Sequence, residues 1–156
     1  MKLYCVMNSY VRGAQLAPQV AHAVAELSGA YDPDEIYPTW LNNHKTVVIL
    51  EAKPEVLSRL ETLCIYVEHP YGSFKEAGLN NTRTGVSFIL TEEQLELANE
   101  IRNWKSRNKN TQWGGSSTEM DALYEYLNNI NKARHISTDE IELLTTVRTL
   151  QTHRGF

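Results

Sequence analysis

Residues Lys2 to Leu27 read KLYCVMNSYVRGAQLAPQVAHAVAEL and carry the strongest structural pattern in the chain. Residues 2–8 are an apolar run of strand length, and residues 9–13 are typical of a loop. From residue 16 onward the apolar side chains recur at steps of three and four, the period of a helix with one buried face. Pro18 fits only the first helical turn, and Gly29 is a natural stop. The sequence therefore predicts a strand, a loop and a helix in succession.

Strand and helix patterns continue to alternate as far as Leu90. We expect a short helix within residues 32–43 that ends near Trp40, strands at 45–52, 65–69 and 84–90, and a helix that starts at 53–55. The segment from Pro70 to Arg83 is rich in Gly, Asn and Ser and is expected to be a loop. Because loops often carry function, it is the first place to look for a site.

After Thr91 every periodic segment is typical of a helix. Three helix-start signals stand at residues 91–94, 116–119 and 137–140, each with a Ser or Thr that can cap a helix. The pattern predicts an α/β domain over residues 1–91 and a helical extension over residues 92–156 packed on it.

Composition and cysteine usage fit a globular chain. It has 156 residues, of which 42% are hydrophobic and 22% charged, enough to fill a core. We find no apolar run of the roughly 18 residues that a membrane span needs and no signal-peptide pattern, so we expect a cytoplasmic protein without membrane contact. Cys5 and Cys64 stand in apolar stretches without a metal-ligand pattern, which favours buried thiols and no metal site.

A row of polar side chains lines the first expected helix. Gln15, Gln19 and His22 are spaced by four and three, so they share one face. Buried amides and an imidazole would cost several kcal/mol if unpaired, so this face must meet water, a partner or a ligand. His22 also fits a partly buried structural histidine.

Residues 15–23, QLAPQVAHA, resemble the signature region of the archaeal and eukaryotic (type two) peptidyl-tRNA hydrolases, which reads roughly G-K-x-A-x-Q-x-x-H-A. The similarity continues through Trp40 and the strand at 45–50 to residues 75–78 and the strand at Thr84, about the first ninety residues. The resemblance implies a mixed four-stranded sheet flanked by helices, hydrolysis of the ester between a peptide and the terminal ribose of tRNA, and no cofactor.

The resemblance also implies catalytic positions. Glu76 takes the place of the family's aspartate and would orient or deprotonate water. Asn80 and Thr84 fall at two threonine positions and would supply hydrogen bonds. Gln15 takes the place of the family's lysine and supplies no charge, although charge-assisted hydrogen bonds are about twice as strong as neutral ones.

The missing cation has two candidate replacements. Arg12, in the loop before the helix, and Lys75, beside Glu76, could each supply it, although both also fit ordinary surface charge. Gln19 and His22 would support the site as substrate-binding or structural residues.

A net charge of −4 requires that any RNA-binding surface be local. The best patch is residues 102–109, RNWKSRNK, with four basic and no acidic residues, and Trp113 follows it. Lys105 and Arg107 would neutralise phosphates while an exposed Trp stacks on an unpaired base. A solvated helix end explains the same charges, since basic residues favour the last helical turn.

Two hypotheses of function follow. The first is a peptidyl-tRNA hydrolase-like enzyme with tRNA as its partner. The second is a catalytically impaired module that kept the fold and binds tRNA or a protein, and Gln15 favours it. Hydrolysis of an unrelated small ester or amide stays open, as does the oligomeric state, a homodimer included.

Overall fold

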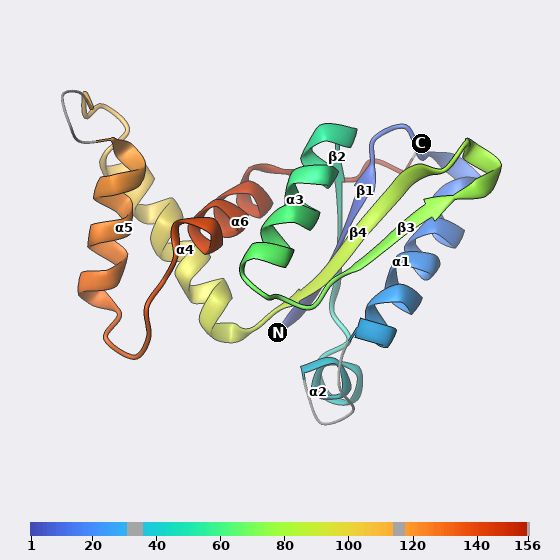
Figure 1. Ribbon diagram of the computed structural model, residues 1–156, viewed down its shortest axis with the longest axis horizontal. Coiled ribbons are helices and arrows are strands. Elements are labelled where there is room, and N and C mark those ends of the chain that lie inside the picture. The colour runs from blue at the N-terminus through green and yellow to red at the C-terminus, as the bar shows by residue number, and fades with distance from the viewer. Residues whose placement is uncertain (31–35, 114–117, 156) are drawn as a thin grey trace.

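The computed structural model describes residues 1–30, 36–113 and 118–155, and it is an α/β fold built on a five-stranded mixed sheet (Figure 1). The strands are β1 (Lys2–Asn8), β2 (Val47–Ala52), β3 (Gly72–Glu76), β4 (Thr82–Leu90) and β5 (Gln151–Thr152), in the order β3-β4-β1-β2-β5. The α/β class is as the sequence predicts, whereas the sheet has five strands instead of four. The fifth strand comes from the expected helical extension.

Three strands end at the same edge of the sheet. Strand β1 is parallel to β2 and antiparallel to β4, and β4 is antiparallel to β3. Strands β1, β2 and β3 therefore run in one direction, and their last residues, Asn8, Ala52 and Glu76, stand at one edge. This edge, where parallel strands present their carboxyl ends, is where α/β proteins usually place their ligands.

Helices cover both faces of the sheet. They are α1 (Leu16–Ala30), α2 (Ile36–Asn43), α3 (Pro54–Tyr66), α4 (Glu92–Arg107), α5 (Glu119–Ile130) and α6 (Thr138–Thr149), with short 3₁₀ turns η1 (Gly13–Gln15) and η2 (Ala77–Leu79). Leu3, Cys5 and Met7 of β1 pack on the α1 face. Tyr4 and Val6 face the larger core that contains side chains of α3, α4 and α6, as the alternation of a strand requires. Figure 1 shows α1 and α3 on opposite sides of the sheet.

The prediction of a strand at residues 65–69 is wrong. Helix α3 continues to Tyr66, because Leu57, Leu60 and Cys64 extend its buried stripe at steps of three and four. The Ile65 side chain is 55% exposed, so this apolar run does not enter a core as a strand would.

The third strand instead lies inside the segment that the sequence predicts to be a loop. Its polarity has a steric cause at Gly72, where a Cβ atom would stand 2.5 Å from the backbone nitrogen of Leu27 in α1. Helix α1 lies so close to β3 that only glycine fits there. This contact explains the glycine at residue 72, which counts against a strand when the sequence is read alone.

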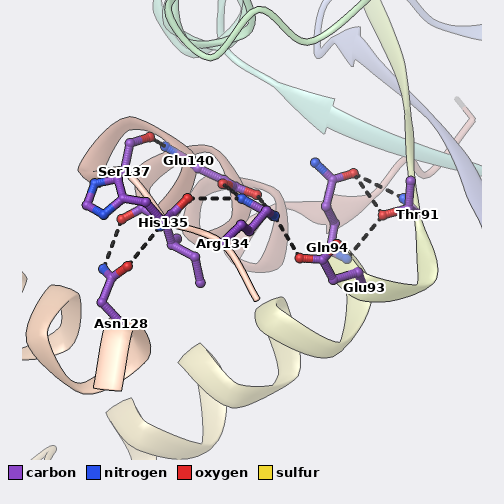
Figure 2. Close-up of polar contacts among 9 residues, drawn as sticks. Thr91, Glu93, Gln94, Asn128, Arg134, His135, Ser137 and Glu140 are labelled. Carbon is purple, nitrogen blue, oxygen red and sulfur yellow. Dashed lines mark hydrogen bonds and ion pairs between the residues drawn. The ribbon is translucent and has the colours of Figure 1, made fainter. Parts of the chain in front are cut away.

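The three helices after β4 begin where the sequence predicts, and their connections are held by polar contacts (Figure 2). Thr91 and Gln94 form a reciprocal capping box, and Thr118 and Ser137 cap α5 and α6. Of the second predicted signal, Ser116 and Ser117 lie outside the described residues.

An arginine ties the loop between α5 and α6 to two helices. Arg134 donates to both carboxylate oxygens of Glu140 on α6, at 2.8 and 2.7 Å, and to Glu93 on α4 at 2.8 Å (Figure 2). The Glu140 side chain is almost fully buried, so its charge depends on this partner. The helices share one hydrophobic core with the α/β part.

The last described residues form the outermost strand of the sheet, beside β2. Strand β5 pairs antiparallel with β2, and the His153 backbone nitrogen donates to the Ile49 carbonyl at 3.0 Å. Beyond it the Gly13 nitrogen donates to the Gly155 carbonyl at 3.0 Å. Among the described residues, no helix is both long enough and apolar enough to cross a membrane.

Candidate functional site

The polar row of α1 and the acidic turn after β3 meet in one pocket. The Gln19 Nε2 atom donates to Glu76 Oε2 at 2.9 Å, although 57 residues separate them. The pocket has a volume of about 320 Å³ and is lined by Ala14, Gln15, Pro18, Gln19, Glu76, Gly78 and Leu79. The structure thus brings Gln15, Gln19 and Glu76 together at the carboxyl edge of β1 and β3.

Glu76 is held as a carboxylate. It is the last residue of β3 and accepts hydrogen bonds from the Gln19 amide and from the Gly78 backbone nitrogen, the latter at 3.3 Å. These two bonds, and the charge of His22, lower the pKa of Glu76 below its ordinary value of 4.5. At neutral pH the pocket therefore presents an ionised acceptor whose geometry is fixed.

A β-bulge turns Thr84 toward α1. Phe74 pairs with Gly85 and Lys75 with Arg83, so Thr84 is the extra residue of β4. Arg83 donates to Ser58 of α3, on the other face of the sheet. Thr84 instead donates to Gln19 Oε1 at 2.7 Å and is fully buried.

The outcome is a chain of hydrogen bonds that passes from a hydroxyl through an amide to a carboxylate. Thr84 donates to the oxygen of Gln19, and the nitrogen of Gln19 donates to Glu76. Gln19 accepts through its oxygen and donates through its nitrogen, so the orientation of its amide is fixed by its two partners. Thr84 does not line the pocket and acts through Gln19.

Close packing brings α1 to the strands. The Ser87 hydroxyl donates to the Ala23 carbonyl at 2.6 Å, and a Cβ atom at Gly85 would stand 2.8 Å from the Met7 sulfur. Together with Gly72, these small residues let the helix approach the sheet. Gln19 can therefore reach both Thr84 and Glu76.

Sequence reasoning missed Asn8, which holds the same region from the opposite strand. Asn8 is 1% exposed, and its Nδ2 atom donates to the Arg83 carbonyl at 3.1 Å, directly before the bulge. Its Oδ1 atom accepts from the Tyr10 nitrogen at 3.0 Å and starts the loop toward α1. The one available signal was a polar residue at the end of an otherwise apolar strand.

His22 lies beside the pocket and is exposed. Its ring stacks on Phe74 with centroids 4.3 Å apart and planes 14° from parallel. The ring is exposed and not partly buried as a structural histidine would be, and its charge also lowers the pKa of Glu76.

Neither proposed replacement cation lines the pocket. Arg12 forms an ion pair with Glu51 of β2 at 3.5 Å between Nη2 and Oε2. Lys75 stands between Phe74 and Glu76, whose side chains face α1, so strand alternation directs Lys75 to the opposite face of the sheet. Within the described residues, the pocket lining includes no Lys or Arg.

Asn80 is exposed and is not among the pocket-lining residues. It ends η2 with a left-handed backbone, φ 58°, and Asn81 follows at φ 55°. Asparagine adopts this conformation more readily than most other residues, so Asn80 serves to form the turn.

The basic patch of α4 lies at the other end of the molecule from the pocket (Figure 1). Arg107 donates to the Tyr126 hydroxyl at 3.1 Å and lies over the Tyr126 ring. Lys105 is 3.9 Å from Glu119. Trp113 stacks on the buried Trp104, with centroids 5.7 Å apart, so one face of its ring is already covered.

The described residues contain no cluster of three or more His, Cys, Asp or Glu side chains that could hold a metal ion. The chemistry available in the pocket is that of an ionised carboxylate beside two amides. Such a group can accept a proton from water or hold a hydroxyl or amine donor of a ligand. The hydrogen bonds from Gln19 and Gly78 fix the orientation of the Glu76 carboxylate, and one side of the carboxylate faces the pocket.

In comparisons with protein-family models and with curated proteins, no match to this chain was found.

Proposed function

We propose that the chain hydrolyses the ester bond between a peptide, or a blocked amino acid, and tRNA, with Glu76 as the group that orients and deprotonates water. The observation that carries the proposal is the hydrogen-bonded series Thr84, Gln19, Glu76 at the pocket wall. The similarity of residues 15–23 to the type two peptidyl-tRNA hydrolases supports the same chemistry.

In this reaction Glu76 accepts a proton from a water molecule in the pocket, and the water oxygen forms a bond with the ester carbonyl carbon. The bond from that carbon to the ribose oxygen then breaks, and the ribose oxygen takes up the proton held by Glu76 and leaves as a hydroxyl, which restores the carboxylate. A carboxylate with a lowered pKa is a weak base but is fully ionised at neutral pH. Its main contribution is therefore the position of the water.

Gln15 would take the role of the missing cation. It is exposed and lines the pocket at the N-terminal end of α1. Its amide can donate to the oxyanion of the tetrahedral intermediate but brings no charge. The proposal therefore predicts slow turnover.

A second candidate is a module that binds tRNA or a protein without turnover. The observation that favours it is the pocket lining, in which Glu76 is the sole charged residue among those that the structure describes. A carboxylate without a cation can hold an amine or hydroxyl group of a ligand but stabilises a developing negative charge poorly.

The test is release of the blocked amino acid from an N-acetylated aminoacyl-tRNA. We expect Glu76→Gln to abolish release, and Glu26→Gln, which removes an exposed carboxylate elsewhere on α1, to leave it unchanged. Equal rates for the parent and Glu76→Gln would refute the enzymatic role of Glu76.

Gln15→Lys separates the two candidates. If the parent is silent and Gln15→Lys gains release, the site is complete except for its cation, and the binding module describes the parent chain. If neither protein releases the amino acid, the hydrolytic proposal fails.

A further inference from the structure

The segment Gln151–Gly155, called here the strap, fixes the loop that leads into α1. The His153 Nε2 atom bonds to the Val11 carbonyl at 3.0 Å, and its Nδ1 atom accepts from the Gly155 nitrogen at 2.9 Å. The imidazole therefore carries its proton on Nε2 and donates it to Val11. The Gly155 carbonyl in turn accepts from the nitrogen of Gly13.

These contacts assemble exposed cations from three distant segments at one edge of the sheet. Arg12 lies between Val11 and Gly13, and Arg154 lies between His153 and Gly155, so the imidazole contact and the backbone bond bring these two stretches of chain close together. Lys53 follows Ala52, whose carbonyl accepts from the Ser9 nitrogen at 2.9 Å at the start of the same loop. We call Arg12, Lys53 and Arg154 the basic rim.

The rim is available to a ligand. All three side chains are exposed, and Arg12 keeps 41% of its side chain accessible while it pairs with Glu51. Within the described part of the chain, Lys53 and Arg154 form no ion pair. Figure 1 shows the strap's end beside the segment that leads into α1.

The rim adjoins the candidate pocket. Arg12 comes directly before η1, whose residues Ala14 and Gln15 line the pocket with Glu76. A negatively charged chain that follows the rim would therefore have its end close to the pocket. The α4 patch lacks this continuity, because it lies at the opposite end of the long axis and its Arg107 and Lys105 contact α5.

We infer that the basic rim binds the phosphates of a nucleic acid strand whose terminus enters the pocket, in place of the α4 patch that the sequence favours. Lys and Arg at such a surface neutralise phosphates without reading bases. The rim thus supplies the cations that the pocket itself lacks. The inference rests on the proposed function for its choice of tRNA, but binding is measured separately from hydrolysis.

The experiment compares two double variants of the full chain in binding to deacylated, fluorescently labelled tRNA. Lys53→Gln/Arg154→Gln removes two rim charges, and Lys105→Gln/Arg107→Gln removes two charges from the α4 patch. Dissociation constants are measured between about 50 and 200 mM salt, where phosphate contacts dominate the change in affinity. Thermal melting of each protein verifies that the fold is kept.

We expect the rim variant to bind tRNA about fivefold or more weakly than the parent at low salt. The slope of log affinity against log salt should become shallower by about 1.5, since each lost phosphate contact contributes about 0.7–0.9. The α4 variant should keep the parent's affinity and slope. A larger loss in the α4 variant, a rim loss without a change in slope, or a parent that does not bind tRNA at low salt would each overturn the inference.

A last comparison separates this inference from the proposed function. Glu76→Gln should bind tRNA at least as tightly as the parent, because it removes a negative charge beside the pocket. Rim-dependent binding together with absent hydrolysis would refute the proposed activity and leave the rim intact. If the rim variant hydrolyses limiting tRNA at the parent's rate, the rim inference is refuted and the proposed activity is left intact.

Discussion

Replacing Gln19 with leucine tests the centre of the site, because this one amide joins the helix, the bulge and the turn. Thr84 is fully buried and donates to Gln19 at 2.7 Å, while its other acceptor, the Phe74 carbonyl, is 3.4 Å away. Gln19→Leu keeps the volume but leaves the Thr84 hydroxyl without a good partner. A buried unsatisfied hydroxyl costs about 1–3 kcal/mol, so we expect that loss in the free energy of unfolding.

The assay is urea denaturation of Gln19→Leu, of Thr84→Val and of the double variant, with Gln15→Leu as the matched control. Gln15 is one turn earlier and exposed, so its replacement should change stability by less than about 0.5 kcal/mol. The double variant should lose less than the sum of the single variants, because both polar partners are then absent. Additive losses, or a Gln19→Leu protein as stable as the control, would refute the reasoning.

The same variant has a pH signature. The Gln19 amide is the largest cause of the lowered pKa of Glu76, so the pKa should rise in Gln19→Leu and can be followed by NMR titration. A carboxylate whose pKa is lower in the folded state stabilises the protein above its unfolded pKa, and this contribution is lost as the pH falls through the folded pKa. The difference in stability between the parent and Gln19→Leu should therefore narrow below about pH 4. If the difference in the free energy of unfolding stays constant down to acid pH, Glu76 does not contribute to it.

Three further outcomes are expected. In urea denaturation, Arg134→Met should lower the free energy of unfolding by about 2–3 kcal/mol, which is less than for a fully buried pair because Arg134 is 37% exposed. The double variant Arg134→Met/Glu140→Gln should recover part of the lost stability, because the buried carboxylate is then also removed. Gly72→Ala should cost about 2 kcal/mol or more in the same assay, because its Cβ meets the backbone of α1, whereas Gly29→Ala, with open space around it, should stabilise α1 by about 0.5–1 kcal/mol. Burial raises the pKa of both cysteines to about 12, so iodoacetamide should label them only after unfolding; rapid labelling of the native protein at neutral pH would contradict their burial.

Elements with a strong internal pattern could be predicted from the sequence. The strand at residues 2–8, the first helix and the cap at Thr91 follow from apolar periodicity and capping chemistry, which are local properties. Strand β3 could not be predicted, because its residues are chosen for contact with α1 at Gly72 and leave no apolar run. Strand β5 has two residues and is defined only by its pairing with β2.

The candidate site also has features that could be predicted from the sequence and features that could not. The shared face of Gln15 and Gln19 follows from helical spacing, whereas their position beside Glu76 depends on the fold, which joins segments 57 residues apart. The bulge at Thr84 is a register shift between two strands, and no spacing within one strand reveals it. The rim is also invisible in the sequence, because Arg12 and Arg154 are 142 positions apart and their segments come together only through the His153 imidazole and one backbone hydrogen bond.

The strap has a consequence for the order in which the molecule matures. Its imidazole bonds to a carbonyl 142 residues earlier in the chain, so the loop that borders the pocket gains its last contacts only after residue 153 has been synthesised. Pairings of such long separation form late, since loop closure must precede them. A nascent chain that has not reached residues 151–155 should hold its central strands while the loop beside the pocket stays unfinished.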